Sequence, residues 1–191
     1  STLDRSSAAS DVYKRQSLNC VLEASADDLM QVNGIGETSA TLITLAFQLT
    51  KKYLKNASDK KLKKYDGPES VKELLMSKYL GAREEMVYML SLDFDDNILA
   101  INKISHGTFS AANIDKRFVL ETAFRNKARS VVLVHNHVNG IPVPSRDDLN
   151  TTKAVGDFFQ GVNVHLLDHL IYTDEDIFSM AQVKKFAPLF I

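Results

Sequence analysis

Two histidines separated by one residue, His135 and His137, are the residues of this sequence whose types and spacing most directly suggest chemistry. They follow four consecutive apolar residues, 131–134, three of which are β-branched, and such a run is typical of a buried strand. Because side chains alternate between the two faces of a strand, positions i and i+2 project to the same side. The two imidazoles can therefore reach one metal ion.

A loop containing glycine and two prolines, residues 138–144, ends this strand, and Ser145 and Asp148 follow where a helix is expected to begin. Their spacing is that of a capping box, in which the serine caps the helix and the acid bonds back. Asp148 can also complete a metal site with His135 and His137, with water as the fourth ligand. Three protein ligands and one open position are typical of a catalytic zinc ion.

Each motif has a purely structural alternative, because histidines at a strand end are often exposed polar residues and Ser145 with Asp148 can be a cap alone. The two interpretations are compatible, since a cap fixes the rotamers that a metal site needs. Their co-occurrence within one short stretch favours a metal site with His135, His137 and Asp148 as ligands.

The stretch resembles the signature of the JAMM (MPN-type) zinc metallopeptidases, and more closely that of their bacterial RadC-like branch. The typical RadC-like text is HNHPSG, then PS-x-x-D, then threonines and a later DHI segment. This sequence has HNHVNG, PSRDD, the pair Thr151-Thr152 and Asp168-His169-Leu170-Ile171. It departs at Val138 and Asn139, where the family usually has Pro-Ser, and neither would be a ligand. The resemblance covers about residues 26–183.

The resemblance implies an α/β fold, a JAMM (cytidine-deaminase-like) mixed-sheet sandwich, with Zn²⁺ as cofactor and a protein or peptide as substrate. It places a catalytic glutamate seven residues before the leucine of Leu92-Asp93, which is Glu85. The neighbouring Glu84 is the rival, and alternation along a strand puts the two on opposite faces. In this interpretation Glu85 is the general base and Ser145 donates its hydroxyl to the oxyanion.

Composition sets the broad class. A chain of 191 residues with 45% hydrophobic content can bury a sizeable core. Its formal net charge of −1 produces no overall positive electrostatic field that would attract nucleic acid. The single cysteine, Cys20, excludes an internal disulfide and fits a reducing cytosol. Neither an apolar run of membrane-spanning length nor a secretory signal is visible, so the expected location is cytoplasmic, without a membrane partner.

Residues 17–56 are expected to form a helix-hairpin-helix module that precedes the zinc domain. Ser25 with Asp28 indicates a helix start, and Gly34 and Gly36 bracket the turn before a second helix. Glycines let a backbone approach phosphate, so DNA is a candidate partner, with Lys51, Lys52 and Lys55 extending the contact; these residues form the predicted nucleic-acid site. The alternatives are an αα-hairpin that needs glycine for its turn and a solvated lysine-rich helix end.

The remaining boundaries follow from composition. Residues 1–16 lack periodicity and are expected to be an unstructured or foreign leader, residues 57–67 a Lys-rich linker, and residues 68–191 the JAMM/RadC-like zinc domain. Compared with the family, the chain is expected to be N-terminally truncated.

Alternating elements are expected within the zinc domain. A helix over 68–80 precedes a strand that begins at residue 83 and is closed by the turn Asp95-Asp96-Asn97, and its hairpin partner follows over 98–109. A helix over 115–128 carries Phe118, Val119, Ala123 and Phe124 toward the sheet, and a helix over 145–159 follows the strand that carries His135. A late strand over 162–173 would hold His165 and His169 on one face, with His169 a packing or hydrogen-bonding residue.

Three functions are compatible with these features. The first is a zinc metallopeptidase that hydrolyses an amide or isopeptide bond. The second is a nucleic-acid-associated accessory protein of DNA repair or recombination with weak or no catalysis, and the third is a metal-dependent nuclease. The residue pattern of the sequence does not choose an amide over a phosphodiester.

Overall fold

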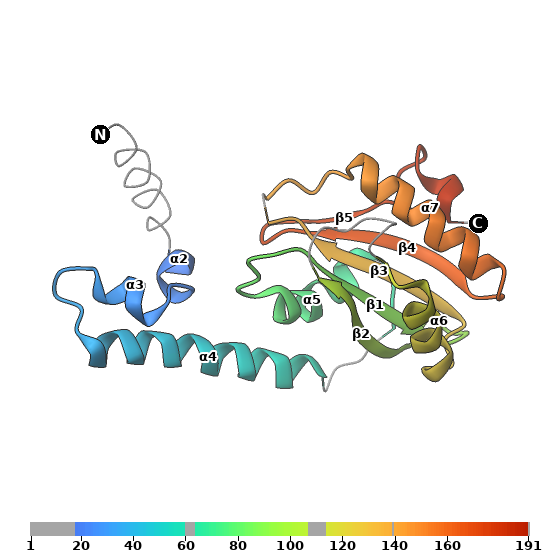
Figure 1. Cartoon of the computed structure of the whole chain (residues 1–191). Helices are drawn as coiled ribbons and strands as arrows, with labels where there is room; N and C mark the ends of the chain where they lie inside the picture. The colour runs from blue at the N-terminus through green and yellow to red at the C-terminus, as the bar shows by residue number, and fades with distance from the viewer. Residues whose placement is uncertain (1–17, 60–63, 107–113, 139, 191) are drawn as a thin grey trace. The chain divides into compact units, whose positions relative to one another are not determined.

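A computed structural model describes residues 18–59, 64–106, 114–138 and 140–190, and divides the chain into two units, Ser1–Asn56 and Ala57–Ile191 (Figure 1). The expected leader over residues 1–16 lies outside the described residues. The helices and strands, in chain order, are α2 (Leu18–Leu22), α3 (Ala26–Met30), α4 (Glu37–Asp59), η1 (Pro68–Val71), α5 (Lys72–Tyr79), β1 (Met86–Leu92), β2 (Ile98–His106), α6 (Lys116–Arg125), β3 (Ser130–Asn136), α7 (Arg146–Gln160), β4 (His165–Tyr172), β5 (Ile177–Ser179) and η2 (Ala187–Leu189).

The first unit consists of helices α2 and α3 and of α4 as far as Asn56. Ser25 caps α3 in a complete capping box with Asp28, as the sequence indicates. Gly34 has a φ of 91°, a left-handed conformation that favours glycine, and it turns the chain from α3 into α4. Helix α4 continues to Asp59, so the first residues of the stretch expected to be a linker are helical.

The second unit is built on a five-stranded sheet in the order β2-β1-β3-β4-β5. β1 pairs antiparallel with both β2 and β3, β3 pairs parallel with β4, and β4 pairs antiparallel with β5. The expected hairpin and the mixed sheet are therefore confirmed. Strand β3 lies at the centre and is buried along its whole length, which explains its continuous apolar sequence.

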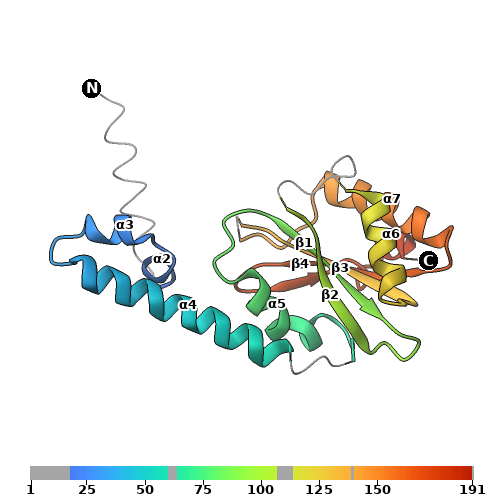
Figure 2. The ribbon, with the colours of Figure 1, turned by 60° about the horizontal axis from the view of Figure 1, so that its bottom comes forward.

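Two layers of helix cover the sheet, and together they make an α/β sandwich (Figure 2). One face packs on α6 and α7 through Val119 and Phe159, and it carries the odd-numbered β3 residues Val131 and Leu133. The other face packs on η1 and α5, and it carries the even-numbered residues Val132 and Val134. His135 continues the odd series, so it projects toward the layer that contains α7.

Helix α6 packs on the sheet through fewer of its apolar residues than expected. Val119 and Ala123 are buried, but Phe118 and Phe124 are exposed, and Thr122 takes a buried position instead. The buried residues are spaced by three and four positions, which is the repeat of one helix face. Phe118 and Phe124 each lie one residue away from that face. The expectation that both phenylalanines face the sheet is therefore wrong.

The expectation that His165 and His169 share one face of a strand is also wrong. A register shift interrupts the pairing of β3 with β4 between Val131 and Val132, where a β-bulge adds one residue to β4. His165 therefore pairs with Ser130 on the α5 side, whereas His169 pairs with Leu133 on the α7 side. Strict alternation from His165 cannot detect an inserted residue.

A buried carboxylate ties the beginning of the second unit to the far edge of the sheet. Asp168 accepts hydrogen bonds from the Tyr65 hydroxyl at 2.8 Å, the Ser179 hydroxyl at 2.6 Å and the amides of His169 and Ala181 at 2.7 and 3.0 Å. Tyr65 thus belongs to the packed second unit, although it falls in the range expected to be a linker. None of the helices in the described part of the chain combines the length and apolarity that crossing a membrane requires.

Candidate metal centre

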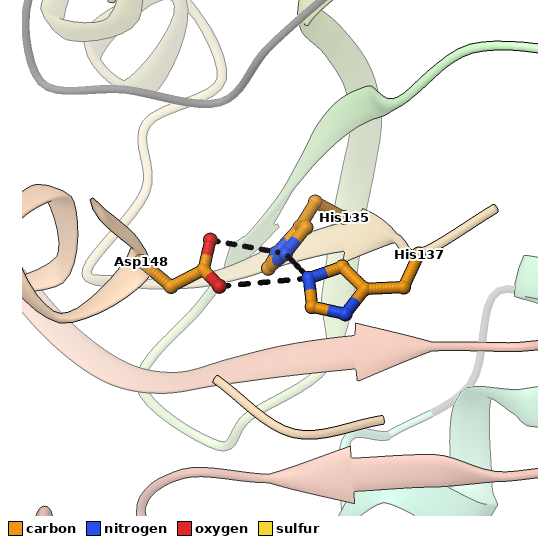
Figure 3. Close-up of side chains that lie close together, drawn as sticks. All are labelled: His135, His137 and Asp148. Carbon is orange, nitrogen blue, oxygen red and sulfur yellow. Dashed lines mark hydrogen bonds and ion pairs between the residues drawn. The ribbon is translucent and has the colours of Figure 1, made fainter. Parts of the chain in front are cut away.

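His135, His137 and Asp148 bring three ligand atoms together at the end of β3 and the beginning of α7 (Figure 3). The Nε2 atoms of the two histidines are 2.8 Å apart. Asp148 places Oδ1 3.2 Å from Nε2 of His135 and Oδ2 3.5 Å from Nε2 of His137. Two ligands bound about 2.1 Å from a tetrahedral metal ion are separated by roughly 3.4 Å, so the three separations here are close to those that such an ion needs.

The three residues come from elements that the sequence fixes strongly. β3 is a fully buried central strand, and its alternation points His135 and His137 to one side. Asp148 is the third residue of α7, whose N-cap is Ser145 in a complete capping box: Ser145 Oγ accepts from the Asp148 amide at 3.1 Å, and Asp148 Oδ2 accepts from the Ser145 amide at 2.7 Å. The cap thus holds the carboxylate toward the histidines.

The partner of His137 determines which of its ring nitrogens carries hydrogen. Nδ1 of His137 lies 2.8 Å from the carbonyl oxygen of Ile141, and because a carbonyl only accepts, Nδ1–H donates this bond. In the neutral ring, Nε2 is then unprotonated, and its lone pair points to the place that Asp148 and His135 also face. The loop after His137 contains the two positions that depart from the RadC-like sequence motif. Val138 is exposed, and Asn139 lies outside the described residues.

The charge states fit a cation at this place. Burial opposes ionisation of Asp148, but the contacts of its carboxylate with the imidazoles of His135 and His137 outweigh it and hold the pKa of its carboxyl well below its usual range. The hydrogen bond with Asp148 raises the pKa of His137, although burial acts in the opposite direction. The Asp148 carboxylate is negatively charged, and the raised pKa of His137 means that its imidazole binds a proton more readily than usual. Both groups face the same point, so a proton and a metal ion compete for binding there.

His169 and Thr152 lie directly behind His135. Nε2 of His169 is 2.9 Å from Nδ1 of His135, and Nδ1 of His169 is 2.6 Å from Oγ1 of Thr152. Thr152 donates to the backbone carbonyl of Asp148 at 2.6 Å. All three side chains are fully buried, and burial, followed by the nearby His135, lowers the pKa of His169 well below its usual range, so its ring is neutral.

Glu85 lies immediately before β1, across from His137. The antiparallel register pairs Val87 with His135, and the same register extended by two residues sets Glu85 opposite His137. The carboxylate is close enough to raise the pKa of His137. Glu85 is half-buried, whereas Glu84 is exposed and falls on the other side of the strand.

Asn136, the residue between the two histidines, points to the opposite face and is buried. Its Oδ1 accepts a hydrogen bond from the amide of Met86 at 2.7 Å, and its Nδ2 donates to the carbonyl of Glu84 at 3.2 Å. These two bonds hold the backbone on both sides of Glu85. Sequence reasoning missed this contact, because an asparagine between two ligands carries no signal of its partner.

The predicted nucleic-acid residues lie apart from one another in the first unit. Gly34 and Gly36 form the turn before α4, whereas Lys51 and Lys52 lie in α4 itself, fifteen positions beyond Gly36 for Lys51. At 1.5 Å per helical residue this separates the glycines from Lys51 by roughly 22 Å. Lys55 is also in α4, and its side chain is outside the described part of the chain. The structure does not gather these residues into one compact site.

Comparisons with known proteins give one consistent result. The family model described as "RadC-like JAB domain" matches residues 65–185. A UPF0758 protein of Clostridium perfringens is 30% identical over 165 residues, covering 86% of this chain and 72% of that protein. UPF0758 proteins of Paracidovorax citrulli and Methanosarcina mazei are each 32% identical, over 162 and 151 residues, covering 85% and 79% of this chain and 68% and 66% of the relatives.

Proposed function

This chain belongs to the family of RadC-like JAB domains, and on that premise we propose that it is a zinc-dependent metallopeptidase that hydrolyses a peptide or isopeptide bond. The observation that supports this most is the convergence of His135 Nε2, His137 Nε2 and one carboxylate at separations of 2.8 to 3.5 Å. Two imidazoles and one carboxylate form a donor set that suits zinc and leaves a position open.

When bound there, a zinc ion supplies Lewis acidity, which activates water and polarises a carbonyl group. The protein's own part begins with Glu85, whose carboxylate lies beside His137 on the ligand face of the strand. It takes the proton of the attacking water and delivers it to the nitrogen of the leaving amine, as a general base and then a general acid. An amine leaving group needs this proton, because amines are expelled poorly as anions.

Ser145 has two compatible roles. Its Oγ accepts the capping hydrogen bond from Asp148, which uses an oxygen lone pair and leaves the O–H to donate elsewhere. Ser145 is exposed at the start of α7, next to the ligand that follows it by three residues. Its hydroxyl therefore donates to the oxyanion that develops on the substrate carbonyl.

The surroundings of the site favour an amide over a phosphodiester. Among the described residues, His135, His137 and Asp148 form the one group with metal-ligand spacing, whereas many metal nucleases use a pair of ions. With zinc bound, the two positive charges of the ion balance the carboxylate of its ligand Asp148 and that of Glu85, so the net charge at the site does not separate the two substrate classes. Because the site suits a single ion, a nuclease is the weaker of the two hydrolytic hypotheses.

A matched pair of variants tests the proposal. Glu85→Gln should bind zinc like the wild type but lose turnover of a library of peptides and isopeptide-linked peptides by about 10² to 10⁴-fold. Glu84→Gln removes the same charge from the opposite side of the strand and should keep both properties. Equal activity of Glu85→Gln and wild type would overturn the assignment of the base. Cleavage of DNA but of no peptide by the zinc-loaded wild type would overturn the proposed substrate class.

A further inference from the structure

We propose that Thr152 and His169 are positioning residues that set the tautomer of His135, so that its Nε2 presents a lone pair to the metal. The inference rests on the metal site of the proposed function but not on its substrate. It assigns a role to two buried side chains that touch no substrate themselves.

The order of donors and acceptors begins at the backbone of Asp148. Oγ1 of Thr152 lies 2.6 Å from the carbonyl oxygen of Asp148, and two oxygens this close need a hydrogen between them. A carbonyl has no hydrogen to give, so the single hydroxyl hydrogen of Thr152 points at Asp148. The oxygen of Thr152 then meets Nδ1 of His169, 2.6 Å away, with its lone pair, and Nδ1–H of His169 must be the donor.

The remaining donors and acceptors in this series of hydrogen bonds follow from the chemistry of imidazole. A neutral histidine that carries hydrogen on Nδ1 has an acceptor at Nε2. Nε2 of His169 is 2.9 Å from Nδ1 of His135, so Nδ1–H of His135 donates to it. His135 is thereby left with an unprotonated Nε2, which is the atom 2.8 Å from Nε2 of His137 and 3.2 Å from Oδ1 of Asp148.

The chain of hydrogen bonds closes on itself through three elements. It starts at the ligand Asp148 in α7, passes through Thr152 one turn later in the same helix, crosses to His169 in β4 and ends at the ligand His135 in β3. The bulge in β4 is essential, because it turns His169 toward α7. Thr152, His169 and His135 are each 0% exposed, so bulk solvent does not compete for these hydrogen bonds.

The test compares Thr152→Val with Thr152→Ser, which differ in the hydroxyl. Nitrogen-15 NMR of the histidine side chains in metal-free protein at pH 8.5 reports the tautomer of each ring, and competition with a chromophoric chelator reports Zn²⁺ affinity. We expect Nδ1–H on His135 in the wild type and in Thr152→Ser. In Thr152→Val we expect a mixture or reversal of tautomers and a 10 to 100-fold loss of Zn²⁺ affinity.

The wild-type spectrum alone can overturn the inference: an Nε2–H tautomer of His135 would do so, whether or not any variant folds. A folded Thr152→Val protein with wild-type tautomer and affinity would also overturn it. Failure of the proposed function would look different. A protein that binds zinc through histidines with hydrogen on Nδ1, yet cleaves no peptide, would support the roles of Thr152 and His169 and contradict only the proposed peptidase activity.

Discussion

The side chain of Asn136 accepts a hydrogen bond from the amide of Met86 at 2.7 Å, and this bond joins the metal-ligand strand to the segment that carries Glu85. The same side chain donates to the carbonyl of Glu84 at 3.2 Å. Because Asn136 lies between His135 and His137 in the chain, a displacement of the strand end moves the ligands and the glutamate together. Glu85, the proposed general base, is thus held in register with the candidate metal ligands by a residue on the opposite face of the sheet.

Replacing Asn136 by alanine should separate positioning of the base from metal binding. The variant keeps all three ligands, so its zinc content should match the wild type, but Glu85 loses both backbone restraints. We expect a fall in kcat of about 10 to 100-fold, since a displacement of about 1 Å can cost that much. Steady-state kinetics on zinc-loaded protein provide the measurement. Loss of zinc in proportion to activity would instead show that Asn136 supports the ligands.

Three substitutions of Ser145 separate its cap from its hydroxyl. Ser145→Ala loses both and should lower the free energy of unfolding by about 1 kcal/mol. Ser145→Gly should lower it by only about 0.3 kcal/mol, because glycine is tolerated at an N-cap. Both variants should lose turnover by about 10²-fold or more, because neither can donate to the oxyanion. Ser145→Thr retains cap and hydroxyl and serves as the control. If Ser145→Gly turned over substrate like the wild type, the cap would be the serine's whole role.

Two tyrosines shielded from water, the half-buried Tyr65 and the buried Tyr172, make the fold sensitive to alkali. Burial, followed by the negative charge of Asp168, raises the pKa of Tyr65 far above its usual value, and burial, followed by Asp174, raises that of Tyr172 to about 12. In the unfolded chain these phenols ionise near pH 10. The unfolded state therefore releases protons that the folded state keeps, and stability falls as the pH rises from about 10 through the folded-state pKa.

Tyr65→Phe isolates one of these groups. The pH dependence of its unfolding free energy between pH 10 and 12 should be shallower than that of the wild type by about one linked proton. At neutral pH the variant should be less stable by about 1.5 to 3 kcal/mol, because the buried Asp168 loses one of its donors. Urea unfolding at several pH values measures both effects, and parallel pH profiles would contradict the assignment.

The hairpin module remains a predicted nucleic-acid contact, and its lysines offer a test. If Lys51 and Lys52 contact phosphates, Lys51→Ala/Lys52→Ala should weaken DNA binding equally for different sequences and reduce the salt dependence of log Kd by up to about two units of slope. Lys184→Ala/Lys185→Ala removes the same charge from the second unit and is the control. Equal losses in the two double variants would indicate a nonspecific charge effect.

Much of the second unit could be predicted because its signals are local. The apolar run of 131–134 predicts a buried strand, and the i, i+2 spacing of His135 and His137 predicts a shared face. The Ser145–Asp148 capping box fixes the start of α7 within one residue. Each of these inferences needs only neighbouring residues, and the mixed-sheet fold follows from their order.

The contacts between distant segments could not be predicted in this way. The bulge in β4 adds one residue and turns His169 to the face of the sheet that packs on α7. The alternation of residue types along the strand does not indicate this extra residue. Likewise, Asn136 and Thr152 acquire their roles from partners on other elements. Strand β5, Ile177–Ser179, is three residues long, too short for a periodic pattern.

Metal content tests whether His135, His137 and Asp148 form a zinc site. Elemental analysis of purified wild-type protein should find close to one zinc ion per chain, and His135→Ala/His137→Ala should find almost none, because two of the three ligands of the site are removed. A His165→Ala variant, which changes an exposed histidine on the other face of the sheet, should retain zinc like the wild type. Absence of bound metal from the wild type, even after loading with zinc, would show that there is no zinc site here and would leave His135, His137 and Asp148 as a strand end beside a helix cap.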